Sequence, residues 1–266
     1  MVLHGALVRE KIKEDLIKKV KKLGREPVLV IVQVGNREDS NVYIRQKQKF
    51  GEEIGVKVLI NKFEEDISQK DLEEKVKKIS ANKNIDGVII QLPLPKHIDS
   101  EKIINLVPVE KDADGLNENF SKKIIPATAR GVIALLDHYR IEIKGKKVVV
   151  IGQSILAGKP IGAELEKRGA EVFRCDINTK NIPEIARGCD ILISAVGRVG
   201  LITKEFVNDK QVVIDVGINR TEEGKLVGDV FFDEVKPLVF SITPVPGGVG
   251  PLTVACLFQN LVDLCE

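Results

Sequence analysis

Short apolar runs alternate with longer amphipathic segments along most of the chain. The runs are rich in Val and Ile and contain few polar interruptions, which is typical of parallel strands covered on both faces. They predict strands at Pro27–Val34, Lys57–Ile60, Ile85–Gln91, Lys147–Ile151, Glu171–Cys175, Ile191–Val196, Val212–Val216 and Val239–Ile242.

The segments between these runs predict helices, because their apolar residues recur three and four positions apart. The expected helices are Ala6–Leu23, Asn41–Ile54 with Ser40 as its cap, Ser68–Ser80, Arg130–Tyr139, Pro160–Arg168 and Leu252–Leu264. Strands that alternate with helices in this way favour an α/β fold with a mainly parallel sheet.

Composition and charge exclude several classes of protein. The 41 basic and 39 acidic side chains leave a net charge of +2, which gives no reason to expect a nucleic acid or an anionic membrane as partner. No apolar run is long enough to span a membrane, and the N-terminus lacks the pattern of a signal peptide, so we expect a cytoplasmic protein. The cysteines and histidines show no metal-ligand spacing, so no metal site is expected.

The segment from Lys146 to Pro160 predicts a strand, a glycine turn and the start of a helix. Gly152 ends the apolar run, and Gly158 precedes a proline that suits the first turn of a helix. The N-terminus of such a helix offers unpaired N–H groups to a pyrophosphate, and Ser154 can add a hydroxyl. The spacing GxSxxxGxP departs from the common GxGxxG, so a plain strand-to-helix turn remains an alternative.

Three further positions point to a dinucleotide. Asp176 follows the next strand, 24 residues after Gly152. An acidic residue about 20 positions after the glycine turn usually accepts hydrogen bonds from the adenosine ribose. A carboxylate there would repel a 2′-phosphate, which favours NAD over NADP; an ordinary loop Asp is the alternative. Two later strands end in Val196-Gly197 and Val216-Gly217, where glycine lets the backbone approach a nicotinamide.

A polar stretch between Leu116 and Ala127 separates two series of strands and helices. We therefore expect two domains with a cleft between them. Residues 1–120 should form a three-layer α/β domain, and residues 121–251 a Rossmann-type parallel-sheet domain that binds the dinucleotide. The last helix, residues 252–266, should pack back on the first domain.

Candidate catalytic residues gather in the first series. Tyr43 and Lys47 are four positions apart, so they share one face of a helix. A partly buried lysine loses pKa and becomes able to exchange a proton near neutral pH. Gln91 ends a buried strand, where its amide can hydrogen-bond a catalytic group, and the Asp114 carboxylate can pair with two parallel N–H groups of a planar ring. A solvated Lys, a loop-capping Gln and an Asp-Gly turn are the structural alternatives.

The segment Pro244–Pro251 holds three prolines and three glycines in PVPGGVGP. It follows the last predicted strand and precedes the last predicted helix. Such a composition builds a rigid wall with few side chains, which suits a loop pressed against a ligand and exceeds what a turn requires.

Together these motifs resemble one family, the bifunctional methylenetetrahydrofolate dehydrogenase/cyclohydrolases. They occur in the order found in that family and span nearly the whole chain. The resembling segments are Ser40-x-x-Tyr43-x-x-x-Lys47, Ile89–Pro95, Pro108–Gly115, Gly152-x-Ser154-x-x-x-Gly158-x-Pro160, Val213–Asn219 and Ile242–Thr253.

The resemblance implies two reactions of one-carbon folate metabolism. A hydride would pass from 5,10-methylenetetrahydrofolate to a nicotinamide, and water would then open 5,10-methenyltetrahydrofolate to 10-formyltetrahydrofolate. The lysine matching Lys47 would handle the proton of the hydrolytic step, tuned by the glutamine matching Gln91. The residue matching Tyr43 would stack against the folate, and the aspartate matching Asp114 would grip the pterin.

The resemblance also implies binding residues and an assembly. Folate contacts are expected from Tyr43, Asp114, Gly247, Gly248, Gly250 and Pro251, and dinucleotide contacts from Gly152, Gln153, Ser154, Gly158, Asp176, Val196, Gly197 and Ile218. Members of the family usually form homodimers through the dinucleotide-binding domain. The expected partners are therefore tetrahydrofolate derivatives and a second copy of the chain.

The cofactor half departs from the family pattern at two positions. Gln153 stands where the family often has Arg, and Asp176-Ile177 replaces a His-Ser pair or a basic residue. Both changes remove partners of a 2′-phosphate, which favours NAD. Because most members use NADP, we keep NADP as the expected cofactor and NAD as the alternative.

Three other functions remain open on these residues. A different dinucleotide-dependent dehydrogenase, such as one acting on shikimate, would explain the glycine turn but not Tyr43 and Lys47 together with the Pro/Gly loop. A monofunctional NAD-dependent methylenetetrahydrofolate dehydrogenase is a closer variant. A non-catalytic nucleotide or folate sensor would have lost Lys47 or Asp114, and both are present.

Overall fold

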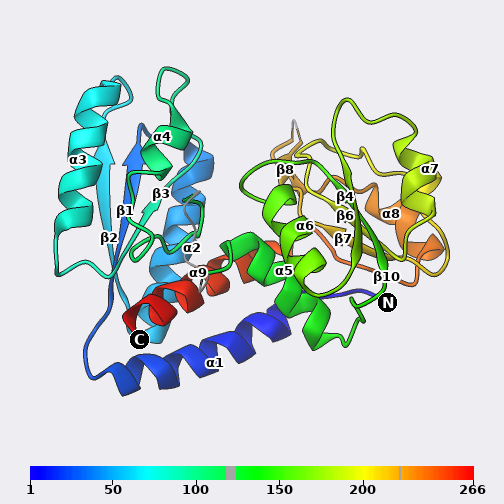
Figure 1. The fold of residues 1–266 in the computed structure, drawn as a ribbon, viewed down its shortest axis with the longest axis horizontal. Coiled ribbons are helices and arrows are strands. Elements are labelled where there is room, and N and C mark those ends of the chain that lie inside the picture. Colours follow the sequence, from blue (N-terminus) through cyan, green and yellow to red (C-terminus); the bar gives the residue numbers. More distant parts are fainter. Residues whose placement is uncertain (118–123, 222) are drawn as a thin grey trace. The chain divides into compact units, whose positions relative to one another are not determined.

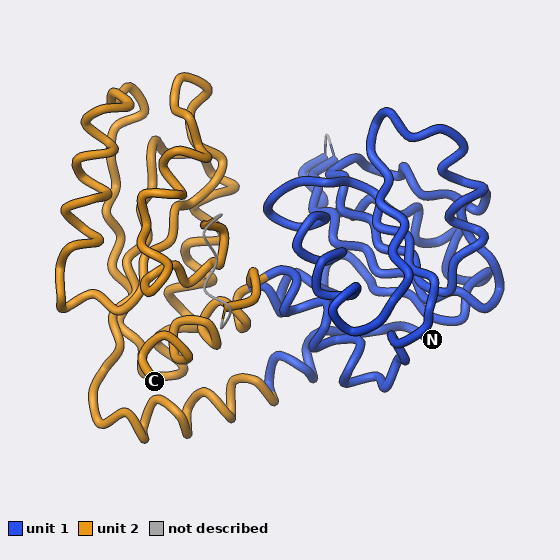
Figure 2. The backbone as a smooth tube through the Cα atoms, viewed as in Figure 1, with its two compact units in different colours: residues 1–10, 128–253 blue, residues 11–127, 254–266 orange. Residues whose placement is uncertain are grey.

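The computed structural model describes residues 1–117, 124–221 and 223–266 (Figure 1). The chain folds into two compact units (Figure 2): unit 1 consists of residues 1–10 and 128–253, and unit 2 of residues 11–127 and 254–266. The helices α1 (Gly5–Leu23) and α9 (Gly250–Cys265) therefore contribute residues to both units. The expected boundary at residues 120 and 121 lies outside the described residues, and the expected cleft stays a prediction.

Unit 2 is built on a parallel sheet with the strand order β2-β1-β3. The strands are β1 (Val28–Val34), β2 (Lys57–Phe63) and β3 (Gly87–Ile90), and the helices are α2 (Glu38–Ile54), α3 (Gln69–Ala81) and α4 (Ser100–Ile104). The central strand β1 is apolar almost throughout and buried after its first residue, as expected of a parallel strand covered on both faces. The strand β2 lies at one edge of this sheet, and its residues are exposed or only partly buried.

The second half of α9 completes the core of unit 2. The rings of Phe258 and of Phe50 on α2 lie 5.3 Å apart between centroids. Leu261 lies so close to Gly87 on β3 that a Cβ at residue 87 would collide with the leucine side chain. Both α9 side chains are fully buried. Residues 254–266 thus supply core that the earlier part of unit 2 lacks.

Unit 1 is built on a five-stranded parallel sheet with the order β10-β7-β6-β4-β5. Its strands are β4 (Lys147–Ile151), β5 (Glu171–Cys175), β6 (Ile191–Ser194), β7 (Val212–Asp215) and β10 (Ser241–Ile242). The chain runs outward from β4 to β5 and then crosses back to β6. The order of strands therefore reverses between β4 and β6, which is where open α/β sheets bind ligands at the carboxyl ends of their strands.

Shorter elements complete unit 1. Its helices are α5 (Ala127–His138), α6 (Gly158–Lys167), α7 (Ile182–Arg187) and α8 (Phe232–Val235), with 3₁₀ turns at Lys204–Phe206 and Lys236–Leu238 and a small hairpin of β8 (Asn219–Arg220) and β9 (Leu226–Val227). Ala186 of α7 and Val235 of α8 belong to one buried cluster with strand residues such as Leu192. These helices therefore seal one face of the sheet.

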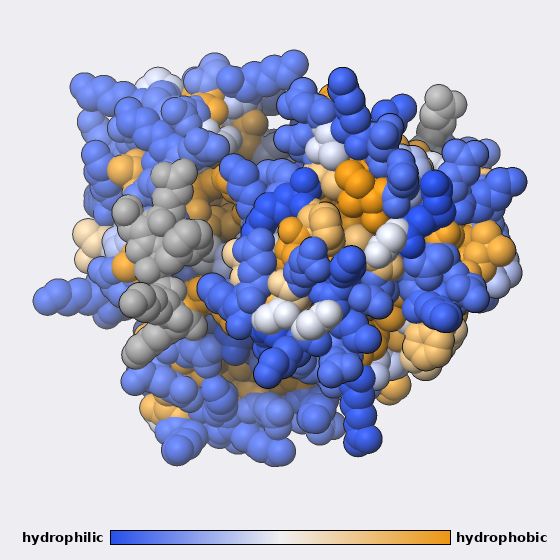
Figure 3. Space-filling view, turned by 45° about the vertical axis from the view of Figure 1, so that its right-hand side comes forward, coloured by the Kyte–Doolittle hydropathy of each residue, from blue (hydrophilic) through white to orange (hydrophobic). Residues whose placement is uncertain are grey.

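The face drawn in Figure 3 is mostly hydrophilic, with apolar residues gathered in patches. Large apolar side chains that unit 1 exposes include Phe240 at 58%, Phe231 at 54% and Val199 at 51%. No helix in the described part of the chain is both long and apolar enough to cross a membrane.

Candidate active site

Lys47 and Gln91 meet at the carboxyl end of the sheet in unit 2. Lys47 lies on α2, and its Nζ donates a hydrogen bond to Gln91 Oε1 at 3.0 Å. Gln91 follows β3, and its Nε2 donates to the carbonyl oxygen of Leu92 at 2.8 Å. The second bond fixes which end of the amide faces the lysine. The sequence-predicted pairing of this lysine with an amide at a strand end is therefore present.

Burial shifts the pKa values of Lys47 and Asp114. Lys47 and Asp114 each keep part of their surface open to solvent, yet the surrounding protein desolvates both charged groups. This desolvation lowers the pKa of Lys47, while the negative charge of Asp114 acts in the opposite direction. The same cause raises the pKa of Asp114, against the effect of the Lys47 charge. The amine is therefore easier to deprotonate than a solvated lysine, as a proton-exchanging group requires.

Buried polar side chains hold the loop that carries Asp114. The Asp112 carboxylate accepts hydrogen bonds from the N–H of Gly115 at 3.0 Å and of Asn117 at 2.7 Å. Asn260 of α9 donates from Nδ2 to the carbonyl oxygens of Ala113 and Ile125, both at 2.9 Å. These bonds fix the backbone immediately before and after Asp114. Burial raises the pKa of Asp112 to about 6.

The sequence did not single out Asp112 or Asn260. The available signals were a second acid two residues before Asp114 and two adjacent amides, Gln259 and Asn260, within the apolar stretch that became α9. Tyr43, which the sequence did single out, lies one turn before Lys47 on α2 and is partly buried. The prediction that Ser40 caps α2 was wrong, because the N-cap is Arg37 and the helix begins at Glu38. Glu38 and Asp39 lie in the first turn, where acidic groups interact favourably with the helix dipole.

The glycine turn of unit 1 lies at the switch point of the sheet. Gly152 follows β4 with φ of +94°, and a Cβ there would collide with the carbonyl group of Ala195, which follows β6. A Cβ at Gly158 would collide with the carbonyl oxygen of Gly152. The N-cap of α6 is Ala157, whose side chain makes no capping bond. The Lys159 N–H donates to the carbonyl oxygen of Ser154 at 3.1 Å, and Pro160 has no N–H. Within the described part of the chain, the Gly158 N–H is thus the first-turn donor left for another acceptor, such as a phosphate.

The other dinucleotide candidates are also in unit 1. Ser154 lies exposed in the turn, whereas the Gln153 amide donates to the carbonyl oxygen of Val150 at 2.9 Å. Asp176 is exposed, and its Oδ1 accepts from the N–H of Asn178 at 2.9 Å and from Thr179 Oγ1 at 3.2 Å. Asp176 therefore shapes its own loop.

Apolar side chains lie at the carboxyl ends of β6 and β7. Val196 and Ile218 are both 40% exposed, and Gly197 has φ of +75° beside Val196. Exposed apolar groups next to a glycine, which has no side chain to obstruct a ligand, suit contact with a flat ring. These positions, with the glycine turn at the start of α6, fit a dinucleotide.

The Pro/Gly loop belongs to unit 1. Gly247 has φ of +104°, and its carbonyl oxygen accepts from the N–H of Gly5 at 2.8 Å. A Cβ at Gly248 would lie 2.6 Å from the carbonyl oxygen of Pro244. Gly250 and Pro251 form the first turn of α9, and a Cβ at Gly250 would lie 3.6 Å from the Ile218 side chain. The loop is therefore rigid, and one end lies beside a dinucleotide candidate.

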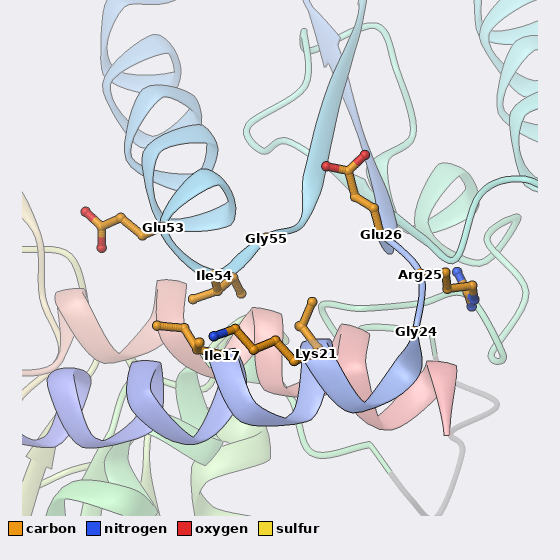
Figure 4. Close-up of a pocket in the computed structure, with 9 residues that line it drawn as sticks. Ile17, Lys21, Gly24, Arg25, Glu26, Glu53, Ile54 and Gly55 are labelled. Atoms are coloured by element: carbon orange, nitrogen blue, oxygen red, sulfur yellow. The ribbon is translucent and has the colours of Figure 1, made fainter.

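A separate pocket of about 460 Å³ in unit 2 contains none of the candidate residues (Figure 4). Ile17 and Lys21 of α1 face Ile54 of α2 across it. Glu26 and Glu53 line it as well. The pocket is broadly open and has mixed charges, so its lining does not define a chemistry. Among the described residues, no group of three or more His, Cys, Asp and Glu side chains could hold a metal ion.

Two family descriptions match the chain. Residues 3–114 match the catalytic domain of tetrahydrofolate dehydrogenase/cyclohydrolase, and residues 126–266 match its NAD(P)-binding domain. The two units thus define an enzyme with a folate-type catalytic half and a dinucleotide-binding half. The chain belongs to the tetrahydrofolate dehydrogenase/cyclohydrolase family.

Individual relatives agree along the full length. The chain is 42% identical over 273 aligned residues to the bifunctional protein FolD 2 of Lactobacillus johnsonii, covering 99% of this chain and 96% of that protein. The crystal structure of the bifunctional FolD enzyme of Campylobacter jejuni superposes with a TM-score of 0.96 at 38% identity, covering 100% of this chain and 98% of that one. The Trypanosoma brucei enzyme, solved with NADP and an inhibitor, gives a TM-score of 0.94 at 34% identity, with coverages of 100% and 97%. These similarities support the bifunctional interpretation and not the alternatives.

Proposed function

We propose that this chain oxidises 5,10-methylenetetrahydrofolate with a nicotinamide dinucleotide and hydrolyses the resulting 5,10-methenyltetrahydrofolate to 10-formyltetrahydrofolate. The observation that carries the hydrolytic half is the desolvated Lys47 amine, whose Nζ donates a hydrogen bond to Gln91. Desolvation lowers the pKa of this amine, and the nearby Asp114 charge partly offsets that shift. The deciding experiment is a spectrophotometric assay of the purified chain with methylenetetrahydrofolate and each dinucleotide, followed by hydrolysis of methenyltetrahydrofolate alone.

In the hydrolytic step, water adds to the carbon that bridges the two folate nitrogens. The neutral Lys47 amine takes a proton from that water as the C–O bond forms. The bond from this carbon to N5 then breaks as N5 takes the proton back from the Lys47 ammonium. The remaining hydroxyl proton passes to solvent as the C=O bond forms, and the formyl group remains on N10. The Gln91 amide keeps the amine in one orientation, while Asp114 accepts the N–H groups of the pterin and Tyr43 stacks against the folate.

The oxidative step depends mainly on positioning. A bound dinucleotide supplies the hydride acceptor, and the chain holds its pyrophosphate at the start of α6 between Gly152 and Gly158. Ser154 adds a hydroxyl, and the exposed Val196 and Ile218 flank the ring. Hydride transfer needs reactants at a fixed distance more than an acid or base, which agrees with the scarcity of histidine in the chain.

We propose NADP as the dinucleotide, with NAD as the alternative that Gln153 and Asp176 favour. Replacing Asp176 with Ser should raise kcat/KM for NADP by about fivefold and leave NAD nearly unchanged, because one charge repulsion of a 2′-phosphate disappears. Serine can still accept from the Asn178 N–H, so the turn is retained. Dehydrogenase rates with both cofactors measure the change. Asp209→Ser, at an exposed position elsewhere in unit 1, is the control.

Two results would contradict this role of Asp176. One is a large preference of the native chain for NADP, since the Asp176 carboxylate would then not weaken binding of the 2′-phosphate. The other is an unchanged NADP-to-NAD ratio in Asp176→Ser.

We also propose that the chain acts in the cytoplasm as a homodimer formed through its dinucleotide-binding half. The support for the dimer is that unit 1 exposes Val199, Phe231 and Phe240 to solvent. Removing large apolar side chains from water by covering them with a partner is favourable.

The acid limb of the hydrolytic pH profile should report Lys47. Because burial lowers the pKa of Lys47, activity should rise with pH well below the ordinary range of a lysine. The Asp114 charge raises that pKa, so Asp114→Asn should move the limb to still lower pH and weaken folate binding. Profiles of kcat against pH test this, with Asp66→Asn at an exposed site of unit 2 as control. A limb that moves toward higher pH in Asp114→Asn would contradict the assignment.

A further inference from the structure

Two carboxylates of unit 1 are buried beneath the loops that follow β6 and β7. Asp229 is fully buried and Asp215 is 3% exposed. A buried carboxylate is costly unless hydrogen-bond donors surround it. Neither residue was singled out from the sequence, and neither has a place in the chemistry described above.

The Asp229 carboxylate is surrounded by five donors. Its Oδ2 accepts from Ser194 Oγ at 2.9 Å and from the N–H groups of Val196 at 2.8 Å and Gly197 at 3.3 Å. Its Oδ1 accepts from the N–H of Arg198 at 2.8 Å and from Asn219 Nδ2 at 3.1 Å. Three consecutive backbone N–H groups of the loop after β6 therefore converge on one side chain, and the Asn219 bond links it to the chain that follows β7.

Asp215 holds Asp229 in place. Its carboxylate accepts from the N–H of Asp229 at 3.0 Å, of Val230 at 2.9 Å and of Gly217 at 2.9 Å. Asp215 ends β7, so the backbone around Asp229 is tied directly to the sheet.

Two glycines make room for these carboxylates. A Cβ at Gly217 would collide with the Asp229 carboxylate, and one at Gly228 would collide with that of Asp215. Close packing of backbone against both acids is therefore built into the sequence at these positions.

We infer that Asp229 is a positioning residue for dinucleotide binding. Its carboxylate fixes the Val196–Arg198 backbone in one conformation, so the loop that presents Val196 and Gly197 to the cofactor is ordered before the cofactor arrives. Binding then loses less conformational entropy. This inference rests on the proposed function, because it takes these residues as cofactor contacts.

Asp229→Asn tests the inference, because it keeps the shape of the side chain but turns one acceptor into a donor that faces N–H groups. We expect the dissociation constant for the dinucleotide, measured by calorimetry, to rise about tenfold or more. Amide hydrogen exchange at residues 195–198 should accelerate without ligand. Hydrolysis of methenyltetrahydrofolate, which needs no hydride acceptor, should stay within about twofold of the native rate. The control is Asp233→Asn, an exposed acid four residues further on.

Unchanged affinity and exchange in Asp229→Asn would overturn the inference, and so would an equal loss of both activities, which would mean a merely structural role. If the variant does not fold, Ser194→Ala decides: it removes one of the five donors and should weaken dinucleotide binding severalfold, and native affinity would overturn the inference. A native chain without dehydrogenase activity would defeat the proposed function, whereas the binding and exchange measurements would still test Asp229.

Discussion

Lys47→Ala should lower the rate of methenyltetrahydrofolate hydrolysis by about a thousandfold and reduce the dehydrogenase rate far less. Removing a general base costs roughly 10²–10⁴ in rate, and the hydrolytic step loses the group that takes the proton from water. Hydride transfer loses only a neighbour of the folate. Both rates are measured spectrophotometrically on the same preparation, so differences in folded protein cancel.

The matched control for this experiment is Lys49→Ala. Lys49 lies two residues further along α2 with its side chain exposed, and the same change there should leave both rates near native. Equal residual rates for the two reactions in Lys47→Ala would remove Lys47 from the proton-handling role.

Gly158→Ala should have the opposite effect to Lys47→Ala, lowering the dehydrogenase rate and sparing hydrolysis. The added Cβ would collide with the carbonyl oxygen of Gly152, so either the turn after β4 or the start of α6 must move. We expect dinucleotide affinity and dehydrogenase kcat/KM to fall about a hundredfold, because the Gly158 N–H and the turn that would receive the pyrophosphate shift. Hydrolysis of methenyltetrahydrofolate should remain and shows that the protein has folded.

Gly188→Ala is the matched glycine control. Residue 188 has φ of −78°, and an added Cβ would come no closer than 3.4 Å to another atom. Alanine should be tolerated there with native dinucleotide affinity. A Gly158→Ala protein that binds the dinucleotide as well as Gly188→Ala does would exclude the glycine turn as the phosphate site.

The buried strands were the most predictable part of the fold. The expected bounds coincide with β4 and β5, and the expected start of β1 differs by one residue. β1 and β4 are nearly continuous apolar runs in which pattern and packing agree, whereas β5 is an edge strand with exposed Glu171 and Arg174. The edge strand β2 continues through Asn61 and Lys62 to Phe63, beyond its apolar run, because backbone pairing with β1 needs no apolar side chain there.

The short elements could not be predicted from periodicity. α4, α7 and α8 are too brief to show a repeat of apolar positions, and the β8–β9 hairpin has only two residues in each strand. Tertiary packing stabilises them instead, as the complete burial of Ala186 and Val235 shows.

The candidate site was predictable where chemistry and spacing coincide. Tyr43 and Lys47 share a helix face, and the strand-end Gln91 contacts the lysine. The acids and amides that hold the loops, such as Asp112, Asp229 and Asn260, were missed. Their sequence neighbourhoods are ordinary, and only the folded chain shows which backbone N–H and carbonyl groups they satisfy.

The division of α1 and α9 between the two units has a consequence for biosynthesis. Unit 2 takes Phe258 and Leu261 from the final stretch of this sequence, so its core stays open while residues 11–127 emerge from the ribosome. Unit 2 cannot complete its core, and its apolar surface stays exposed, until residues 254–266 have been translated. A ribosome-bound chain halted before residue 254 should therefore recruit chaperones and be cut readily by protease, and release of the full chain should end both.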